Sequence, residues 1–173
     1  MKKVIISFVC AVFLFAASNA KADDIANAPI PFEKLGLGVK VGNSAIGVNG
    51  AYAIQKNVHL GLGLGISHFT GDAGGTWLYI NPFFRYLFEN EGNLFPFAEF
   101  NFAFSEVPRL VSVSASGNAS TSNSSANFEL GGMWFPLPSV SIGASINILN
   151  YNIDAESLGI GLGGASMMIN WWM

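Results

Sequence analysis

Charged residues are scarce in this sequence. They make up 11% of its 173 residues, whereas a soluble domain usually carries about 25%. So few charges are a poor cover for a surface that faces water. Either the folded chain is prone to associate, or its outer surface does not face water.

The only cysteine, Cys10, lies in a segment that we expect to be removed. A basic start precedes the apolar run VIISFVCAVFLFA, and residues 20–22 (AKA) offer small side chains for cleavage. This pattern predicts a secretory signal peptide over residues 1–22, followed by one domain over residues 23–173. The mature chain then has no thiol, which excludes disulfides, thiolate metal ligands and cysteine nucleophiles.

Basic residues are few as well. Five remain in the mature chain against 11 acidic residues, which gives a net charge of −6. Without a basic patch, nucleic acid is not an expected partner. His59 and His68 have opposite strand parity, so they do not form a metal site. The glycines of LGLGLGIS (60–67) are not followed by a helical pattern, so no nucleotide or other cofactor is expected.

Alternation of apolar residues with small or polar ones is abundant. Most of the alternating stretches are 10 to 13 residues long, whereas strands in soluble sheets average about five or six. A tilted strand that crosses a membrane needs about 9–11 residues. The period of two predicts eight strands, over residues 33–42, 46–55, 58–69, 76–88, 94–106, 126–135, 139–150 and 158–172.

The connections between these stretches alternate in length. They are short after the second, fourth and sixth stretches and about twenty residues long after the fifth, a habit of outer-membrane barrels. A membrane-spanning helix over residues 130–153, which carry no charge, is disfavoured by Pro136, Pro138 and the alternation of SVSIGASINIL. The sequence therefore predicts an all-β fold, an eight-stranded antiparallel up-and-down transmembrane β-barrel.

In such a barrel the outward face meets hydrocarbon and the inward face fills a narrow lumen. We expect the glycines of LGLGLGIS to face the lumen, where they leave room for bulky neighbours. An aromatic girdle is expected at the short-turn interface, formed by Tyr86, Trp134, Trp171 and Trp172. The residues predicted to face lipid are Leu35, Leu37, Leu60, Leu62, Leu64, Ile66, Ile142 and Ile146.

Four charged residues fall in the middle of predicted strands: Lys40, Arg85, Glu99 and Glu129. Each has the parity opposite to that of its apolar neighbours, so all four point inward. Buried charges must be paired to be tolerated, and here two bases face two acids. The pattern predicts a structural ion network in the lumen.

The stretch over residues 82–101, PFFRYLF, a charged turn and NLFPFAEFNF, resembles the central hairpin of outer-membrane β-barrel domain proteins. The resemblance implies an architecture like that of the small eight-stranded OmpA/OmpX-type barrels of Gram-negative bacteria, in the cell outer membrane. It also implies contact with outer-membrane lipid, lipopolysaccharide and the barrel-assembly machinery. Assembly signals in that group end in an aromatic residue, whereas this chain ends in INWWM.

No catalytic residues are predicted. Ser67, His68 and Asp72 are close in sequence, but adjacent strand residues point to opposite faces, so Ser67 and His68 do not form a nucleophile–base pair. The serine-rich segment 108–125 is expected to be a flexible loop that shields the barrel, with contact to an extracellular ligand as the alternative.

Three classes of function remain. The pattern favours an integral outer-membrane barrel with a structural or surface-interaction role and a largely filled lumen. A narrow pore or passage for small apolar compounds is suggested by the many inward glycines, although eight strands leave an interior just wide enough for side chains. The third class is a soluble lipocalin-like calyx that binds a ligand, with its apolar face inward.

Overall fold

A computed structural model describes residues 33–42, 45–69, 75–106 and 122–173. The predicted signal peptide and Asp72 lie outside these ranges. The described part contains no helix that is long and apolar enough to span a membrane. Its strands are β1 (Leu35–Gly42), β2 (Ala45–Gln55), β3 (Val58–Phe69), β4 (Gly75–Leu87), β5 (Leu94–Glu106), β6 (Ser122–Leu137), β7 (Val140–Asn152), β8 (Ser157–Ile160) and β9 (Ala165–Trp172).

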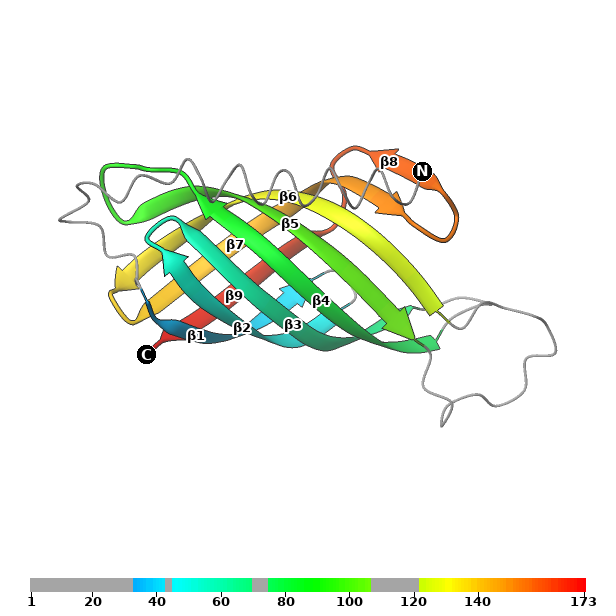
Figure 1. Cartoon of the computed structure of the whole chain (residues 1–173), viewed down its shortest axis with the longest axis horizontal. Coiled ribbons are helices and arrows are strands. Elements are labelled where there is room, and N and C mark those ends of the chain that lie inside the picture. The colour runs from blue at the N-terminus through cyan, green and yellow to red at the C-terminus, as the bar shows by residue number, and fades with distance from the viewer. Residues whose placement is uncertain (1–32, 43–44, 70–74, 107–121) are drawn as a thin grey trace.

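The strands form one antiparallel sheet that closes on itself. Each strand from β1 to β7 pairs with its neighbours in sequence, and β9 pairs with both β7 and β1. β1 to β7 and β9 therefore form the wall of an up-and-down barrel, with strands oblique to its long axis (Figure 1). Because the sheet is closed, every wall strand has a neighbour on both sides, and its backbone N–H and C=O groups can form hydrogen bonds within the barrel. A structure that crosses the hydrocarbon core of a membrane requires such pairing. The prediction of an eight-stranded antiparallel barrel is confirmed.

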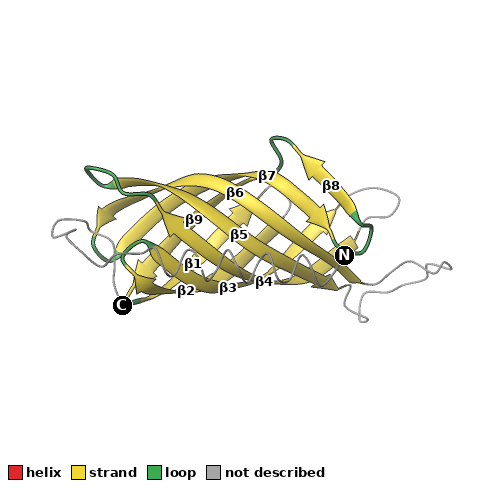
Figure 2. Ribbon diagram, turned by 45° about the horizontal axis from the view of Figure 1, so that its top comes forward, coloured by secondary structure: helices red, strands yellow, loops and turns green. Residues whose placement is uncertain are grey.

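The predicted strand over residues 158–172 is divided in two, so this boundary prediction was wrong. β8 pairs only with the end of β7, and it projects away from the wall (Figure 2). After β8, Gly161 adopts a φ of 154° and donates its N–H to Ile148 O at 3.0 Å. Glycine accepts this conformation at little cost. The alternation of LGIGLGG thus continues through a stretch that leaves the sheet.

β6 begins earlier than the alternation predicts. Residues 122–125 were predicted to end the flexible loop, but they belong to β6 and pair with β5. These positions hold serine and asparagine, so no apolar alternation marks them as a strand. Backbone pairing between β5 and β6 nevertheless continues as far as Ser122 and Glu106. The remainder of the serine-rich segment, up to residue 121, lies outside the described residues.

Apolar side chains cover the outside of the barrel. Leu62, Leu64 and Ile66 are each 46% exposed. Of the other residues predicted to face lipid, Ile142 is half-buried and the rest are exposed: Leu35, Leu37, Leu60 and Ile146. The soluble calyx requires the apolar face to point inward, so that alternative was wrong.

Some of the inward glycines are covered by large side chains from the neighbouring strand. Phe83 lies over its register partner Gly61, and Trp172 lies over its partner Gly36. A Cβ atom at either glycine would overlap the aromatic ring. A glycine on one strand therefore accommodates a bulky side chain of the next, which is how so narrow a barrel is packed.

Candidate functional site

Apolar side chains fill the lumen near the end that carries the turns after β2, β4 and β6, here called the short-turn end. Phe95 and Phe135 meet there edge to face, with ring centroids 5.7 Å apart. These residues pack as a core rather than lining a channel. The full set, here called the apolar layer, is Ala51, Ala53, Phe83, Leu87, Phe95, Phe97, Met133, Phe135, Met168 and Trp172.

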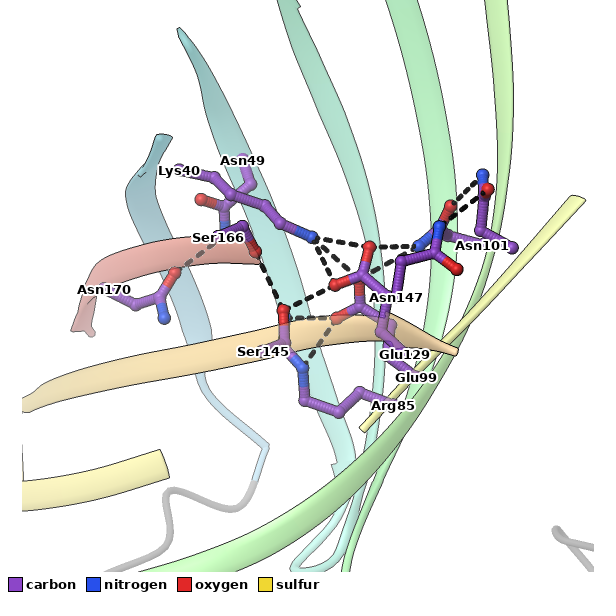
Figure 3. A network of polar contacts seen from close by, with 11 residues as sticks. Lys40, Asn49, Arg85, Glu99, Asn101, Glu129, Ser145, Asn147, Ser166 and Asn170 are labelled. Atoms are coloured by element: carbon purple, nitrogen blue, oxygen red, sulfur yellow. Dashed lines mark hydrogen bonds and ion pairs between the residues drawn. The ribbon is translucent and has the colours of Figure 1, made fainter. Parts of the chain in front are cut away.

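Four charged side chains meet further along the lumen (Figure 3). Lys40 Nζ lies 3.2 Å from Glu99 Oε1 and 3.1 Å from Glu129 Oε2. Arg85 donates from Nε to Glu99 Oε2 at 2.8 Å, and also from Nη2. Arg85 and Glu99 are each only 1% exposed. The structure thus brings together the four residues of the predicted ion network.

Strand register explains why these residues meet. Arg85 on β4 and Glu99 on β5 are register partners, and Glu99 is also the partner of Glu129 on β6. Two carboxylates side by side repel each other. Lys40 reaches from β1 to both of them, and Ser145 donates a hydrogen bond to Glu129. These contacts compensate the negative charges of the buried Glu99 and the partly buried Glu129, and they connect β1 with β4, β5 and β6.

The ion network rests on the apolar layer. Arg85 Cζ lies 5.0 Å from the ring centroid of Phe83 and 4.9 Å from that of Phe97. A guanidinium over an aromatic face is attracted by the ring quadrupole, more strongly where water is excluded. His59, the register partner of Arg85, is fully buried and packs against Trp172 with centroids 4.9 Å apart. His59 is therefore part of the packed interior.

Amide side chains continue the polar network away from the apolar layer. Asn101 donates to Glu129 Oε1 at 2.9 Å, and Asn127 donates to Asn101 Oδ1 at 3.0 Å. Asn147 in turn donates to Asn127 Oδ1 at 3.1 Å. Sequence reasoning missed these residues, although a signal was present: Asn101 and Asn127 share the inward parity of Glu99 and Glu129.

A cavity of about 480 Å³ lies beyond the ion network, towards the opposite end of the barrel, here called the long-loop end. Lys40, Glu99 and Glu129 line its inner end. The sequence predicted a largely filled lumen. The structure shows two different parts: a packed part at the short-turn end and a hollow part beyond it, which is lined by both polar and apolar side chains.

Three of the four residues predicted to form the aromatic girdle lie on the outer face, and the fourth does not. Trp134 and Trp171 are 47% and 51% exposed on the outer face, and Tyr86 is half-buried. Trp172 is instead inside the barrel, where its Nε1 donates to Ser141 Oγ at 3.0 Å. The prediction for Trp172 was wrong because adjacent residues in a strand point to opposite faces. Trp171 and Trp172 therefore cannot both lie at the interface.

The residues considered for catalysis are kept apart. Ser67 lines the cavity, whereas His68 is exposed on the outer face with its Nδ1 3.1 Å from Thr76 Oγ1. A serine nucleophile needs an adjacent base to remove its proton. This pair does not provide that arrangement.

The sequence matches no known protein family and no curated protein. Its fold, however, is similar to solved structures. The N-terminal β-barrel domain of Pseudomonas aeruginosa OprF aligns with a TM-score of 0.57 and 15% identity, over 81% of this chain and 96% of that one. Neisserial surface protein A aligns with a TM-score of 0.50 and 12% identity, over 80% and 92% of the two chains.

A chain from the de novo design of transmembrane β-barrels also aligns, with a TM-score of 0.50 and 14% identity over 83% of this chain and 98% of that one. At these identities the similarity establishes the fold alone. The chain has the architecture of the small eight-stranded outer-membrane barrels.

Proposed function

We propose that this chain is an integral outer-membrane protein whose barrel has a structural or surface-interaction role and does not conduct solutes. The observation that carries the proposal is the ion network, which spans the lumen on top of the apolar layer. A solute on its way through would have to separate Lys40 and Arg85 from their carboxylates. Removing one partner of a buried ion pair costs about 3–5 kcal/mol.

A membrane location accounts for the outer surface. Strands β2 to β5 are 11 to 13 residues long, which suits the tilted crossing of a bilayer. Their outward residues, such as Leu62 and Ile66, form an apolar surface that would cause association in water. The likeness in fold to the OprF domain and to Neisserial surface protein A supports the outer membrane as the site.

The alternative of a passage for small apolar compounds through the lumen has less support. Two of the inward glycines that suggested it, Gly61 and Gly131, are covered by phenylalanine rings. An apolar compound would also have to cross the charged and amide groups around Glu129, where it gains no hydrogen bonds. The proposed function includes no catalytic step.

Planar-bilayer recordings of the purified protein test the proposal. We expect no steady, ohmic channels, because both the apolar layer and the ion network close the lumen. Heat-dependent gel mobility and fractionation with outer membranes show that the protein is folded and inserted. Protein from cells that lack the major porins avoids contaminating channels. Steady channels from such folded protein would contradict the proposal.

A further inference from the structure

The cavity beyond the ion network has the size of a ligand site. Its volume of about 480 Å³ falls within the range of about 300–1,000 Å³ that is usual for small-molecule pockets. Side chains from both sides of the barrel reach it, among them Tyr79 on β4 and Ser166 on β9. The cavity is therefore part of the lumen that the strands enclose, and it is not a shallow depression between loops.

Two acceptor atoms in the cavity wall have no partner. Asn49 Oδ1 and Asn81 Oδ1 are buried and have no hydrogen-bond partner among the described residues. The other amide atom of Asn49 is engaged, since Nδ2 donates to Asn170 Oδ1 at 2.7 Å. That bond fixes the orientation of the Asn49 amide. A buried acceptor without a donor costs about 1–3 kcal/mol. Because both asparagines line the cavity, a ligand donor that reached either oxygen would recover part of that free energy.

These two asparagines lie on either side of a glycine that nothing covers. Asn49, Gly63 and Asn81 are register partners across β2, β3 and β4. A Cβ atom at Gly63 would have no neighbour closer than 3.5 Å. Gly61, two residues away, is covered by Phe83. The open space at Gly63 therefore belongs to the cavity and leaves room between the two acceptors.

The chemistry of the wall favours a neutral molecule. Lys40 and Arg85 are matched by Glu99 and Glu129, so the inner end of the cavity has no net charge to attract an ion. The rest of the wall is rich in amide and hydroxyl groups and includes the aromatic side chains of Trp77 and Tyr79. Aromatic surface with a few placed polar groups is the usual lining of a site for a small organic molecule.

From these observations we propose that the cavity binds a small, neutral, hydroxyl-bearing compound of the size of a mono- or disaccharide. Its hydroxyl groups bond to the amide and hydroxyl groups of the wall, such as those of Asn49 and Asn81, and accept from neighbouring donors such as Lys40 Nζ. This goes beyond the proposed function, because a closed barrel without a ligand would still satisfy that proposal.

Saturation-transfer NMR on the protein in phosphatidylcholine nanodiscs tests the site, with glucose and maltose as probes. Choline and acetate serve as charged comparison compounds. We expect transfer to the sugars and not to the ions. Gly63→Leu fills the cavity and should weaken sugar binding at least about tenfold. Gly50→Leu is the matched control, since Gly50 faces outward on β2 and a Cβ there meets only Leu37 Cδ2, at 3.7 Å.

Folding of each variant is checked by heat-dependent gel mobility. Asn81→Leu, which removes one acceptor with little change of volume, is the second variant should Gly63→Leu not fold. Absence of transfer to both sugars in the folded natural protein would overturn the proposal. Equal sugar binding by the cavity variants and Gly50→Leu would also overturn it. Neither result would affect the proposal of a closed barrel.

Discussion

Among single residues, Leu62 provides the most direct test of which face of the barrel meets lipid. It lies near the middle of β3 on the outer face. An arginine near the bilayer midplane costs about 2–4 kcal/mol, so Leu62→Arg should lower the free energy of unfolding in lipid vesicles by that amount. Leu62→Ala should cost clearly less, and urea titrations of both variants measure the difference. Equal stability of the two would mean that this face does not meet hydrocarbon.

The pair Arg85 and Glu99 allows a test of coupling inside the lumen. Arg85→Gln and Glu99→Gln should each destabilise the barrel by about 3–5 kcal/mol, because each leaves a buried charge without its partner. The double variant should cost less than the sum of the two, since it leaves neither charge of the pair behind. Unfolding of the four proteins in the same lipid gives this interaction free energy. Strictly additive costs would show that the two groups do not interact.

The parity of the charged residues predicted that they point into the lumen, but it did not predict the amide side chains that surround them there. Lys40 and Glu129 are isolated charges among apolar neighbours, so their inward direction follows from alternation alone. The amides of Asn101, Asn127 and Asn170 are inward by the same rule, yet neutral residues are common on either face of a strand and did not stand out. Trp172 shows the opposite failure: its aromatic character indicates the membrane interface, whereas its parity places it inside the barrel.

At the scale of elements, packing between neighbouring strands depends on whether a large side chain of one strand lies over an inward glycine of the next. A Cβ atom at Gly61 would overlap the Phe83 ring and lie 2.5 Å from the Gly50 carbonyl oxygen. Gly61→Ala should therefore destabilise the barrel by about 1–3 kcal/mol through overpacking. Gly63→Ala, on the same strand and face, should have little effect. Urea unfolding of the two alanine variants compares them, and equal costs would contradict this account of the lumen.

The β7–β8 hairpin is expected to tolerate charge where the wall does not. Leu158 is 61% exposed on a strand that pairs only with the last residues of β7, beyond the contacts that close the barrel. Leu158→Arg should change the free energy of unfolding by less than about 1 kcal/mol, measured beside Leu62→Arg in the same vesicles. A loss as large as that of Leu62→Arg would place β8 in the membrane.

The limits of a strand were predictable where large apolar residues alternate with small or polar ones along its whole length. Strands β3 and β5 carry large apolar residues at every second position, and their predicted limits agree with the structure. β6 was predicted too short because its first residues are serine and asparagine. The break before β9 was missed because a glycine-rich segment alternates in the same way whether or not it stays in the sheet.

For the whole molecule, the closed barrel follows from the number, length and parity of the strands. The division of the lumen does not. Whether a glycine leaves open space depends on its partner in the next strand: Phe83 fills the room at Gly61, whereas Asn81 leaves that at Gly63 open. This information lies in the register between strands, which alternation within one strand does not contain.

The central claim is that the apolar face of the closed barrel meets lipid while the other face encloses the lumen. Since residues 23–173 contain no cysteine, single cysteines at Leu62 and Gly63 in a protein of these residues can each carry a bimane label. In vesicles with brominated acyl chains, the account predicts strong quenching of the label at Leu62→Cys and little at Gly63→Cys. Equal quenching at the two adjacent positions, or none at Leu62→Cys in folded protein, would contradict it.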